Sequence, residues 1–231
     1  MPRIARKAPG GQVYHVLNRS VGKIPLFADE ADFEAFQRVM VEAHLRHPIR
    51  ILAYCVLSNH WHFVVWPDSD GEVTDFFRWL AHTHAMRWRV AHRTVGHGHL
   101  YQGRFKSFPV QSDEHLLTVL RYVERNALGG GLVARAEDWR WGSLWARRRG
   151  DKALKAVLSP WPVERPRDWT DRVNAPLSAR ELARLRVSID RGRPFGDDQW
   201  IKRTTSELGL EHTVRPEGRP PKQKPAGEGP K

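Results

Sequence analysis

The sequence has little of what several classes of protein require. Only one of its 231 residues is a cysteine, Cys55, which excludes an intrachain disulfide framework and is typical of a reducing compartment. No apolar run approaches the roughly 20 residues of a transmembrane helix. The basic N-terminus, residues 1–10, lacks the apolar stretch of a secretory signal. These absences predict a cytoplasmic protein that does not enter a membrane.

Negative charge is also scarce. The chain has 26 Asp and Glu against 38 Lys and Arg, which gives a formal net charge of +12. The excess is mainly Arg, whose guanidinium group can bind a phosphate with two parallel hydrogen bonds. We therefore expect a nucleic-acid partner and a nucleoid-associated place in the cytoplasm.

The apolar pattern predicts an α+β domain over residues 1–150. Four strands are expected, at residues 13–17, 49–57, 60–66 and 104–110. Three helices are expected, at residues 29–46, 72–92 and 113–128. The order β-α-β-β-α-β, then a helix, predicts a ferredoxin-like antiparallel sheet with helices on one face.

The amino-acid composition of the chain changes after residue 150. Prolines cluster between residues 160 and 176, and two short helices are expected at 177–190 and 197–208. We interpret residues 151–214 as a Pro-rich linker with a small helical DNA-binding extension, which resembles a helix-turn-helix in outline. Residues 215–231, rich in Pro, Gly, Lys and Arg, are expected to be a basic disordered tail.

His60 and His62 form the first candidate site. Side chains alternate along a strand, so both imidazoles lie on one face while Trp61 points to the core. Two imidazoles on one face can bind one divalent metal ion. The His-x-His pattern recurs at 82/84 on a predicted helix and at 97/99 in a loop, so the pattern alone leaves open a pair of half-buried structural histidines.

Tyr122 and Asn126 form the second candidate site. They are four residues apart on one predicted helix and therefore share a face. A tyrosine has an ordinary pKa of about 10, so it needs help to attack a phosphodiester at neutral pH. A metal ion beside it would offset the charge that develops. Taken alone, a helix tyrosine is more often structural.

Basic segments supply candidate DNA contacts. Arg104 and Lys106 share a strand face, which suits phosphate contact and equally suits a solvated charged face. Gly-Arg-Pro at 192–194 and at 218–220 could lie in an A·T-rich minor groove. The alternatives there are a proline-stopped helix end and a solvated tail.

These motifs occur together and in a fixed order. They are Tyr14-His15 with Asn18-Arg19, Leu57-Ser58-Asn59-His60-Trp61-His62, Gln102-Gly103-Arg104-Phe105-Lys106, Tyr122-Val123-Glu124-Arg125-Asn126 and the two Gly-Arg-Pro segments. Over residues 10–150 the chain resembles the single-tyrosine HUH transposases, and among them the REP-associated tyrosine transposases of bacteria.

The resemblance implies a reaction and a site. His60 and His62 would hold Mg²⁺ or Mn²⁺, and Asn126 stands where relatives supply a third ligand that is often Gln. Tyr122 would attack single-stranded DNA near a REP hairpin, keep a 5′-phosphotyrosine link and later rejoin the strand. The resemblance favours a monomer over a homodimer. The expected DNA contacts are Arg19, Arg104, Lys106, Arg125, Arg191, Arg193 and Arg219.

The sequence departs from the family at two places, and two other functions compete. Gly129-Gly130-Gly131 replaces a segment that often carries Arg, and Tyr101 stands where Trp is usual and places a second hydroxyl near the basic strand. One alternative is a non-catalytic hairpin DNA-binding regulator, for which Tyr122 would point away from the histidines. The other is an RNA-binding module with aromatic residues on an open sheet face.

Overall fold

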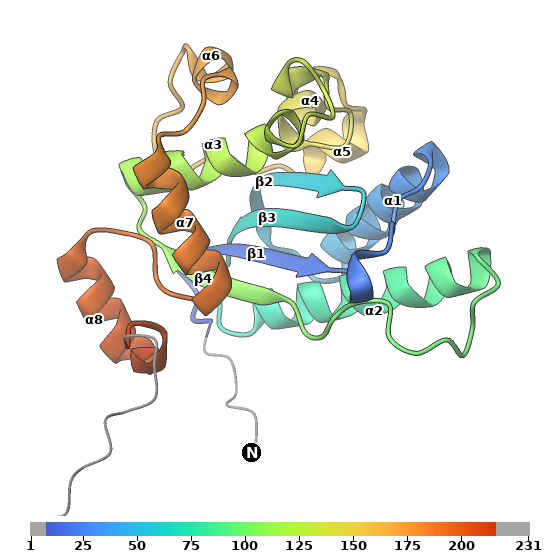
Figure 1. Ribbon diagram of the computed structural model, residues 1–231, viewed down its shortest axis with the longest axis horizontal. Coiled ribbons are helices and arrows are strands. Elements are labelled where there is room, and N and C mark those ends of the chain that lie inside the picture. Colours follow the sequence, from blue (N-terminus) through green and yellow to red (C-terminus); the bar gives the residue numbers. More distant parts are fainter. Residues whose placement is uncertain (1–7, 216–231) are drawn as a thin grey trace, which may run out of the picture.

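Four strands form one antiparallel sheet at the centre of the molecule. The structure is a computed structural model and describes residues 8–215 (Figure 1). The strands are β1 (Val13–Arg19), β2 (Arg50–Leu57), β3 (His60–Trp66) and β4 (Lys106–Val110). Their order in the sheet is β2-β3-β1-β4, and each neighbouring pair is antiparallel. The predicted α+β, ferredoxin-like class is confirmed.

Three long helices accompany the sheet, as predicted. They are α1 (Glu30–Arg46), α2 (Glu72–Ala91) and α3 (Glu114–Gly129). Asp29 caps α1 by accepting a hydrogen bond from the backbone N–H of Asp32, and Asp113 caps α3 by accepting one from that of His115. These caps fix where α1 and α3 begin.

Helices α1 and α2 cover one face of the sheet, as the ferredoxin-like pattern predicts, and α3, which follows that pattern in the chain, covers the other face. The core on the first face includes Trp61 and Phe63 of β3 and the apolar sides of α1 and α2. The core on the second face includes Cys55 of β2 and Val64 of β3, together with the apolar side of α3. The physical reason is visible in the strands: seven of the eight residues of β2 are buried, as expected when both sides are covered.

The segment expected to be a Pro-rich linker is packed against the sheet. It joins both sheet edges through parallel bridges, Leu158 to Ile51 and Phe195 to Val110, and the indole of Trp161 donates to the carbonyl of Leu52. Five helices follow α3: α4 (Ser143–Arg149), α5 (Lys152–Ala156), α6 (Trp169–Asn174), α7 (Ala179–Arg191) and α8 (Asp198–Leu208). Single 3₁₀ turns lie at Val21–Lys23, Ala136–Asp138 and Glu211–Thr213.

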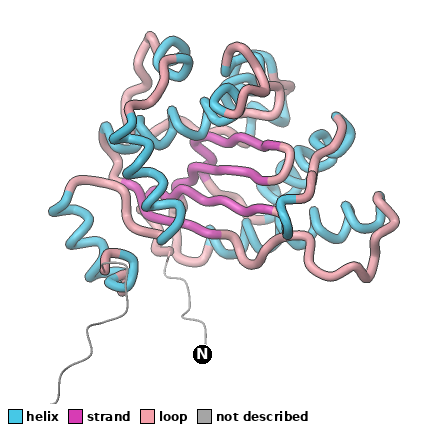
Figure 2. The backbone as a smooth tube through the Cα atoms, in the orientation of Figure 1, coloured by secondary structure: helices cyan, strands magenta, loops and turns pink. Residues whose placement is uncertain are grey.

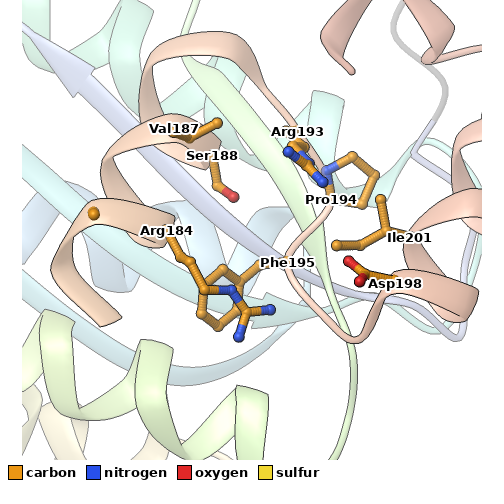
Figure 3. Close-up of a pocket in the computed structure, with 9 residues that line it drawn as sticks. Arg184, Val187, Ser188, Arg193, Pro194, Phe195, Asp198 and Ile201 are labelled. Atoms are coloured by element: carbon orange, nitrogen blue, oxygen red, sulfur yellow. The ribbon is translucent and has the colours of Figure 1, made fainter. Parts of the chain in front are cut away.

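Helix α7 connects this C-terminal part to the β4 side of the sheet (Figures 1 and 2). It begins with a capping box in which Ser178 and Glu181 exchange hydrogen bonds, and it ends at Gly192 in the left-handed conformation. Arg184 of α7 contacts the segment that follows: its guanidinium carbon lies 5.1 Å from the ring centroid of Phe195 (Figure 3), and its guanidinium donates to the carbonyl of Gly196. These contacts fix the turn that leads into α8.

Two further predictions concern the C-terminal tail and membrane insertion. Arg219 and nearly all of the predicted tail lie outside residues 8–215. Among the helices that are described, none is long and apolar enough to cross a membrane.

Candidate active site

His60 and His62 lie side by side on the face of β3 that α3 covers. Their ring centroids are 5.0 Å apart; His60 is half-buried and His62 is buried. Trp61 points to the opposite face and is fully buried, as strand alternation predicted. The pair therefore faces the same layer as the helix that carries Tyr122.

Each histidine has one ring nitrogen fixed by a neighbour. Nδ1 of His60 lies 2.6 Å from Oδ1 of Asn59, and Nδ1 of His62 lies 3.0 Å from Nε2 of His15. Within residues 8–215 no protein group hydrogen-bonds to Nε2 of either His60 or His62. In both rings Nε2 is therefore the nitrogen that is available to a ligand. A hydrogen bond to the other ring nitrogen is the usual way in which a neighbouring group fixes the orientation of a metal-binding histidine.

Sequence reasoning gave His15 no role, although it stands in the first motif of the family resemblance. The residue is fully buried on β1, and its Nδ1 has no hydrogen-bond partner among the described residues. The only signal in the sequence was its place beside Tyr14 in a predicted strand. Its pairing with His62 depends on the register between β1 and β3, which the sequence did not predict.

The two histidines of the pair are held in the neutral form. Burial and, to a smaller extent, the charge of Arg19 lower the pKa of His60 to about 4. Burial, with His15, His60 and Arg19, holds the pKa of His62 well below its ordinary value. A neutral imidazole offers a lone pair, so both Nε2 atoms are suited to bind a divalent cation at neutral pH.

Tyr122 of α3 lies directly against this pair in the same chain. Its ring centroid is 5.7 Å from that of His62 and 6.4 Å from that of His15. Burial raises the pKa of Tyr122, while Asn126 one turn further and the positive charges of Arg186 and Arg19 lower it. The net pKa of Tyr122 stays above its ordinary value, because burial outweighs the three groups that favour the phenolate.

The other three tyrosines do not compete for this role. Tyr14, Tyr54 and Tyr101 are buried, and burial raises the pKa of each well above its ordinary value. The Tyr101 hydroxyl, which the sequence placed near the basic strand, accepts from the indole of Trp61 and lies 2.7 Å from Nδ1 of His84. That hydroxyl is committed to the core on the α1–α2 face.

The predicted DNA contacts separate into distinct groups. Arg19 pairs across the sheet with His60 and lies at the site. Arg104, Lys106 and Arg191 line one hollow of about 420 Å³ between the start of β4 and the end of α7. Arg191 also donates to the carbonyl of Arg215.

Two of the predicted contacts lie elsewhere. Arg125 donates to the carbonyls of Val173 and Asn174, so its guanidinium ties α3 to α6 and is not brought to Tyr122. Arg193 lines a separate hollow of about 250 Å³ between α7 and α8, together with Asp198 (Figure 3).

Arg186 of α7 was not among the predicted site residues. It is exposed, and its charge acts on the Tyr122 hydroxyl. Leu182 and Ile189 of the same helix pack into the core on the α3 face, which brings this helix to Tyr122. No local signal marks Arg186, because its role depends on how the C-terminal part packs.

A second group of potential metal donors lies at the start of α3. One ligand atom each from Asp113, Glu114 and His115 falls within 4.8 Å of the others. Oδ1 of Asp113 already accepts from the backbone N–H of His115 and lies 2.8 Å from its Nδ1. This group is explained as a helix cap, and it precedes Tyr122 by about two helical turns.

The donor set at the His pair fits a divalent metal ion. It comprises two neutral imidazole nitrogens on one strand face, and Asn126, which hydrogen-bonds to Tyr122, lies on the adjoining helix. An imidazole and oxygen set of this kind suits Mn²⁺ and, with water, Mg²⁺.

The fold together with a tyrosine beside a histidine pair defines a class of DNA-processing proteins, and comparison with known proteins specifies it. The family model of IS200-like transposases matches residues 11–126, so the chain belongs to this family. A solved structure of a REP-associated tyrosine transposase bound to a REP hairpin has the same fold, with a TM-score of 0.52 and 17% identity over 78% of this chain and 96% of that one. No curated protein sequence matches the chain. The family resemblance seen in the sequence is confirmed.

Proposed function

We propose that this transposase cleaves and rejoins single-stranded DNA with Tyr122 as the nucleophile. The observation that carries the proposal is the 5.7 Å separation between the ring centroids of Tyr122 and His62 in one chain. A nucleophile next to a pair of neutral imidazoles is the arrangement that phosphodiester transesterification requires.

In the cleavage step, Oη of Tyr122 attacks the scissile phosphorus. The bond from Oη to phosphorus forms and the bond from phosphorus to the 3′ oxygen breaks, so the 5′ phosphate stays on Tyr122. The departing 3′ oxygen gains a proton while the phenol loses one. Attack by a 3′-hydroxyl on the phosphotyrosine reverses these changes and rejoins a strand.

The positive charges around Tyr122 assist this exchange. Arg19 and Arg186 favour the phenolate, and the same guanidinium groups stabilise the additional charge on the phosphate oxygens during the attack. His60, His62 and Asn126 would hold Mg²⁺ or Mn²⁺. The ion, when bound, polarises the scissile phosphate.

The substrate we propose is single-stranded DNA beside a REP-type hairpin. The protein would bind it in the cytoplasm, at the nucleoid. The net charge of +12 and the basic hollow formed by Arg104, Lys106 and Arg191 support an anionic strand near the site. The fold shared with a transposase solved on a REP hairpin supports the hairpin. Because Tyr122 meets the histidines of its own chain, a monomer acting in cis suffices.

The geometry favours catalysis over the two alternatives. A non-catalytic hairpin-binding regulator would be expected to have Tyr122 turned away from His62, and it lies against it. An RNA-binding module would need an open sheet face with exposed aromatic rings, whereas helices cover both faces of this sheet.

A labelled hairpin oligonucleotide with single-stranded flanks, incubated with Mg²⁺ or Mn²⁺, tests the proposal. Wild-type protein should cut the strand, and the fragment whose 5′ phosphate is joined to Tyr122 should stay covalently attached to the protein on denaturing gels. Tyr122→Phe should show neither cleavage nor the covalent adduct, while still binding the hairpin. Tyr14→Phe is the matched control, since Tyr14 lies on the α1–α2 face and should keep full activity. Cleavage by Tyr122→Phe at the wild-type rate would refute the nucleophile assignment.

A further inference from the structure

A cavity of about 770 Å³ lies between α2 and the loop that leads into β4, on the face of the sheet opposite Tyr122. Its volume is in the range of about 300–1,000 Å³ that is typical of small-ligand sites. Among the side chains that line it, the proposed function uses only Arg104, as part of the basic hollow. The Gln102-Gly103-Arg104-Phe105 motif, which had no assigned role beyond phosphate contact, forms one wall.

The lining combines an apolar interior with a polar rim. Phe77, Ala81 and Ala85 come from α2, and Tyr101 from the loop. The rim is formed by exposed residues with polar or basic side chains, namely His82, His99, Gln102 and Arg104. Within residues 8–215 no hydrogen bond or ion pair involves these four rim side chains, so their bonding capacity is available to a ligand.

The charge of the lining favours an anionic ligand, and its aromatic walls favour a ligand with a flat ring. No acidic residue of the described chain lines the cavity, and Arg104 forms no ion pair with any residue from 8 to 215. Imidazole and amide groups can hydrogen-bond to the edge of a nucleobase, and aromatic walls suit stacking, while a free arginine suits the phosphate.

The loop is fixed to the strand end that reaches the active site. The N–H of Gln102 donates to the carbonyl of Arg19, and the Asn18 side chain donates to the carbonyl of Gly103. Asn18 lines the cavity, whereas its neighbour Arg19 pairs with His60 on the other face. Because successive side chains of a strand point to opposite faces, the end of β1 contributes to the cavity through Asn18 and to the Tyr122 side of the sheet through Arg19.

We propose that this cavity binds an unstacked nucleobase of the single-stranded DNA that flanks the scissile phosphate. The strand passes over the end of β1, with one phosphate at Tyr122 and a nearby base between α2 and the 99–105 loop. The inference rests on the proposed function, because the occupant belongs to the same strand that Tyr122 attacks.

The test measures binding rather than cleavage, in the Tyr122→Phe background. The probe is a hairpin oligonucleotide with single-stranded flanks, in which each flanking nucleotide is replaced in turn by an abasic residue. Base stacking on aromatic side chains is worth about 1–3 kcal/mol, so one abasic position should weaken binding by roughly 5- to 150-fold.

The cavity variant is Ala81→Phe, which fills the interior, and Ala91→Phe at the exposed end of α2 is the matched control. Ala81→Phe should bind the intact hairpin as weakly as the protein with an open cavity binds the abasic probe. On Ala81→Phe itself, the abasic substitution should weaken binding no further. Thermal melting establishes that Ala81→Phe is folded. If it does not fold, His82→Ala serves instead: it changes the rim of the cavity, lies outside the basic hollow, and should weaken binding of the intact probe more than binding of the abasic probe.

The outcomes separate this inference from the function on which it rests. One outcome is that the hairpin binds, while every abasic substitution weakens binding equally in Ala81→Phe and in the protein with an open cavity. In that case the cavity assignment is wrong and the proposed DNA cleavage activity stands. If the protein with an open cavity binds no hairpin, the DNA-directed function fails and the cavity assignment fails with it.

Discussion

The hydrogen bond between His15 and His62 predicts a separable effect on metal affinity. If His62 binds a metal ion through Nε2, its ring proton is on Nδ1 and is donated to Nε2 of His15, 3.0 Å away. We expect His15→Phe to remove this acceptor while keeping a ring beside Phe108, whose centroid lies 4.7 Å from that of His15. His15 is then a positioning residue that fixes the tautomer of His62.

The size of the effect follows from what the bond does. Loss of a partner to a metal-binding histidine costs about 10- to 100-fold in metal affinity, or about 1.4–2.7 kcal/mol. The fold should change little, because two effects oppose each other. Donation by His62 leaves the buried Nδ1–H of His15 without a partner, which costs about 1–3 kcal/mol that phenylalanine would recover. The larger phenylalanine ring costs about 1–3 kcal/mol by overpacking.

Titration with Mn²⁺ followed by calorimetry, together with urea unfolding without metal, measures both quantities. His15→Phe should weaken Mn²⁺ binding and leave the free energy of unfolding nearly unchanged, and His15→Asn, which keeps an acceptor oxygen, should recover part of the affinity. Equal losses of metal affinity in the Phe and Asn variants, or a loss of stability alone, would refute the positioning role.

Three further substitutions test other parts of the structure. Arg186→Gln removes a charge that lowers the pKa of Tyr122, so the pH at which cleavage reaches half its maximal rate should rise; an unchanged profile would exclude α7 from the site. Burial raises the folded-state pKa of Glu124, so its contribution to stability is present at low pH and lost as pH rises through that pKa. The melting temperature of wild type relative to Glu124→Gln should therefore fall from pH 4 to pH 8, and a constant difference would contradict the shift. A Cβ at Gly150 would lie 2.5 Å from a carbonyl oxygen of α4, so Gly150→Ala should lower the free energy of unfolding by about 1–3 kcal/mol, whereas Gly129→Ala, with open space around it, should raise it by up to about 1 kcal/mol in urea unfolding.

The local features of this fold could be predicted because their causes are local. The starts of three predicted helices coincide with residues whose side chains cap them, namely Asp29, Asp113 and Ser178. Strand alternation placed His60 and His62 on one face and Trp61 on the other. Each of these inferences uses only neighbours within a few residues.

What could not be predicted depends on contacts between distant segments. The pairing of His15 with His62 requires the register of β1 against β3, and the reach of Arg186 to Tyr122 requires the docking of α7 on the sheet. The family resemblance predicted that Arg125 contacts DNA, and only the packing of α6 shows that its guanidinium donates to two backbone carbonyls.

The placement of α3 is the feature on which the active site depends most. If α3 lay on the same face as α1 and α2, the sheet itself would separate Tyr122 from His62, whose side chain points to the other face. The apolar residues on both sides of β2 draw α3 to the opposite face from α1 and α2, and this brings Tyr122 to 5.7 Å from His62. The same division leaves the α2 side of the sheet free to form the cavity beside Asn18, so a strand attacked on one face can be held on the other. A substitution that loosens α3 from β2, such as Cys55→Ser in the buried strand, should therefore reduce cleavage more than hairpin binding, measured side by side on the same oligonucleotide.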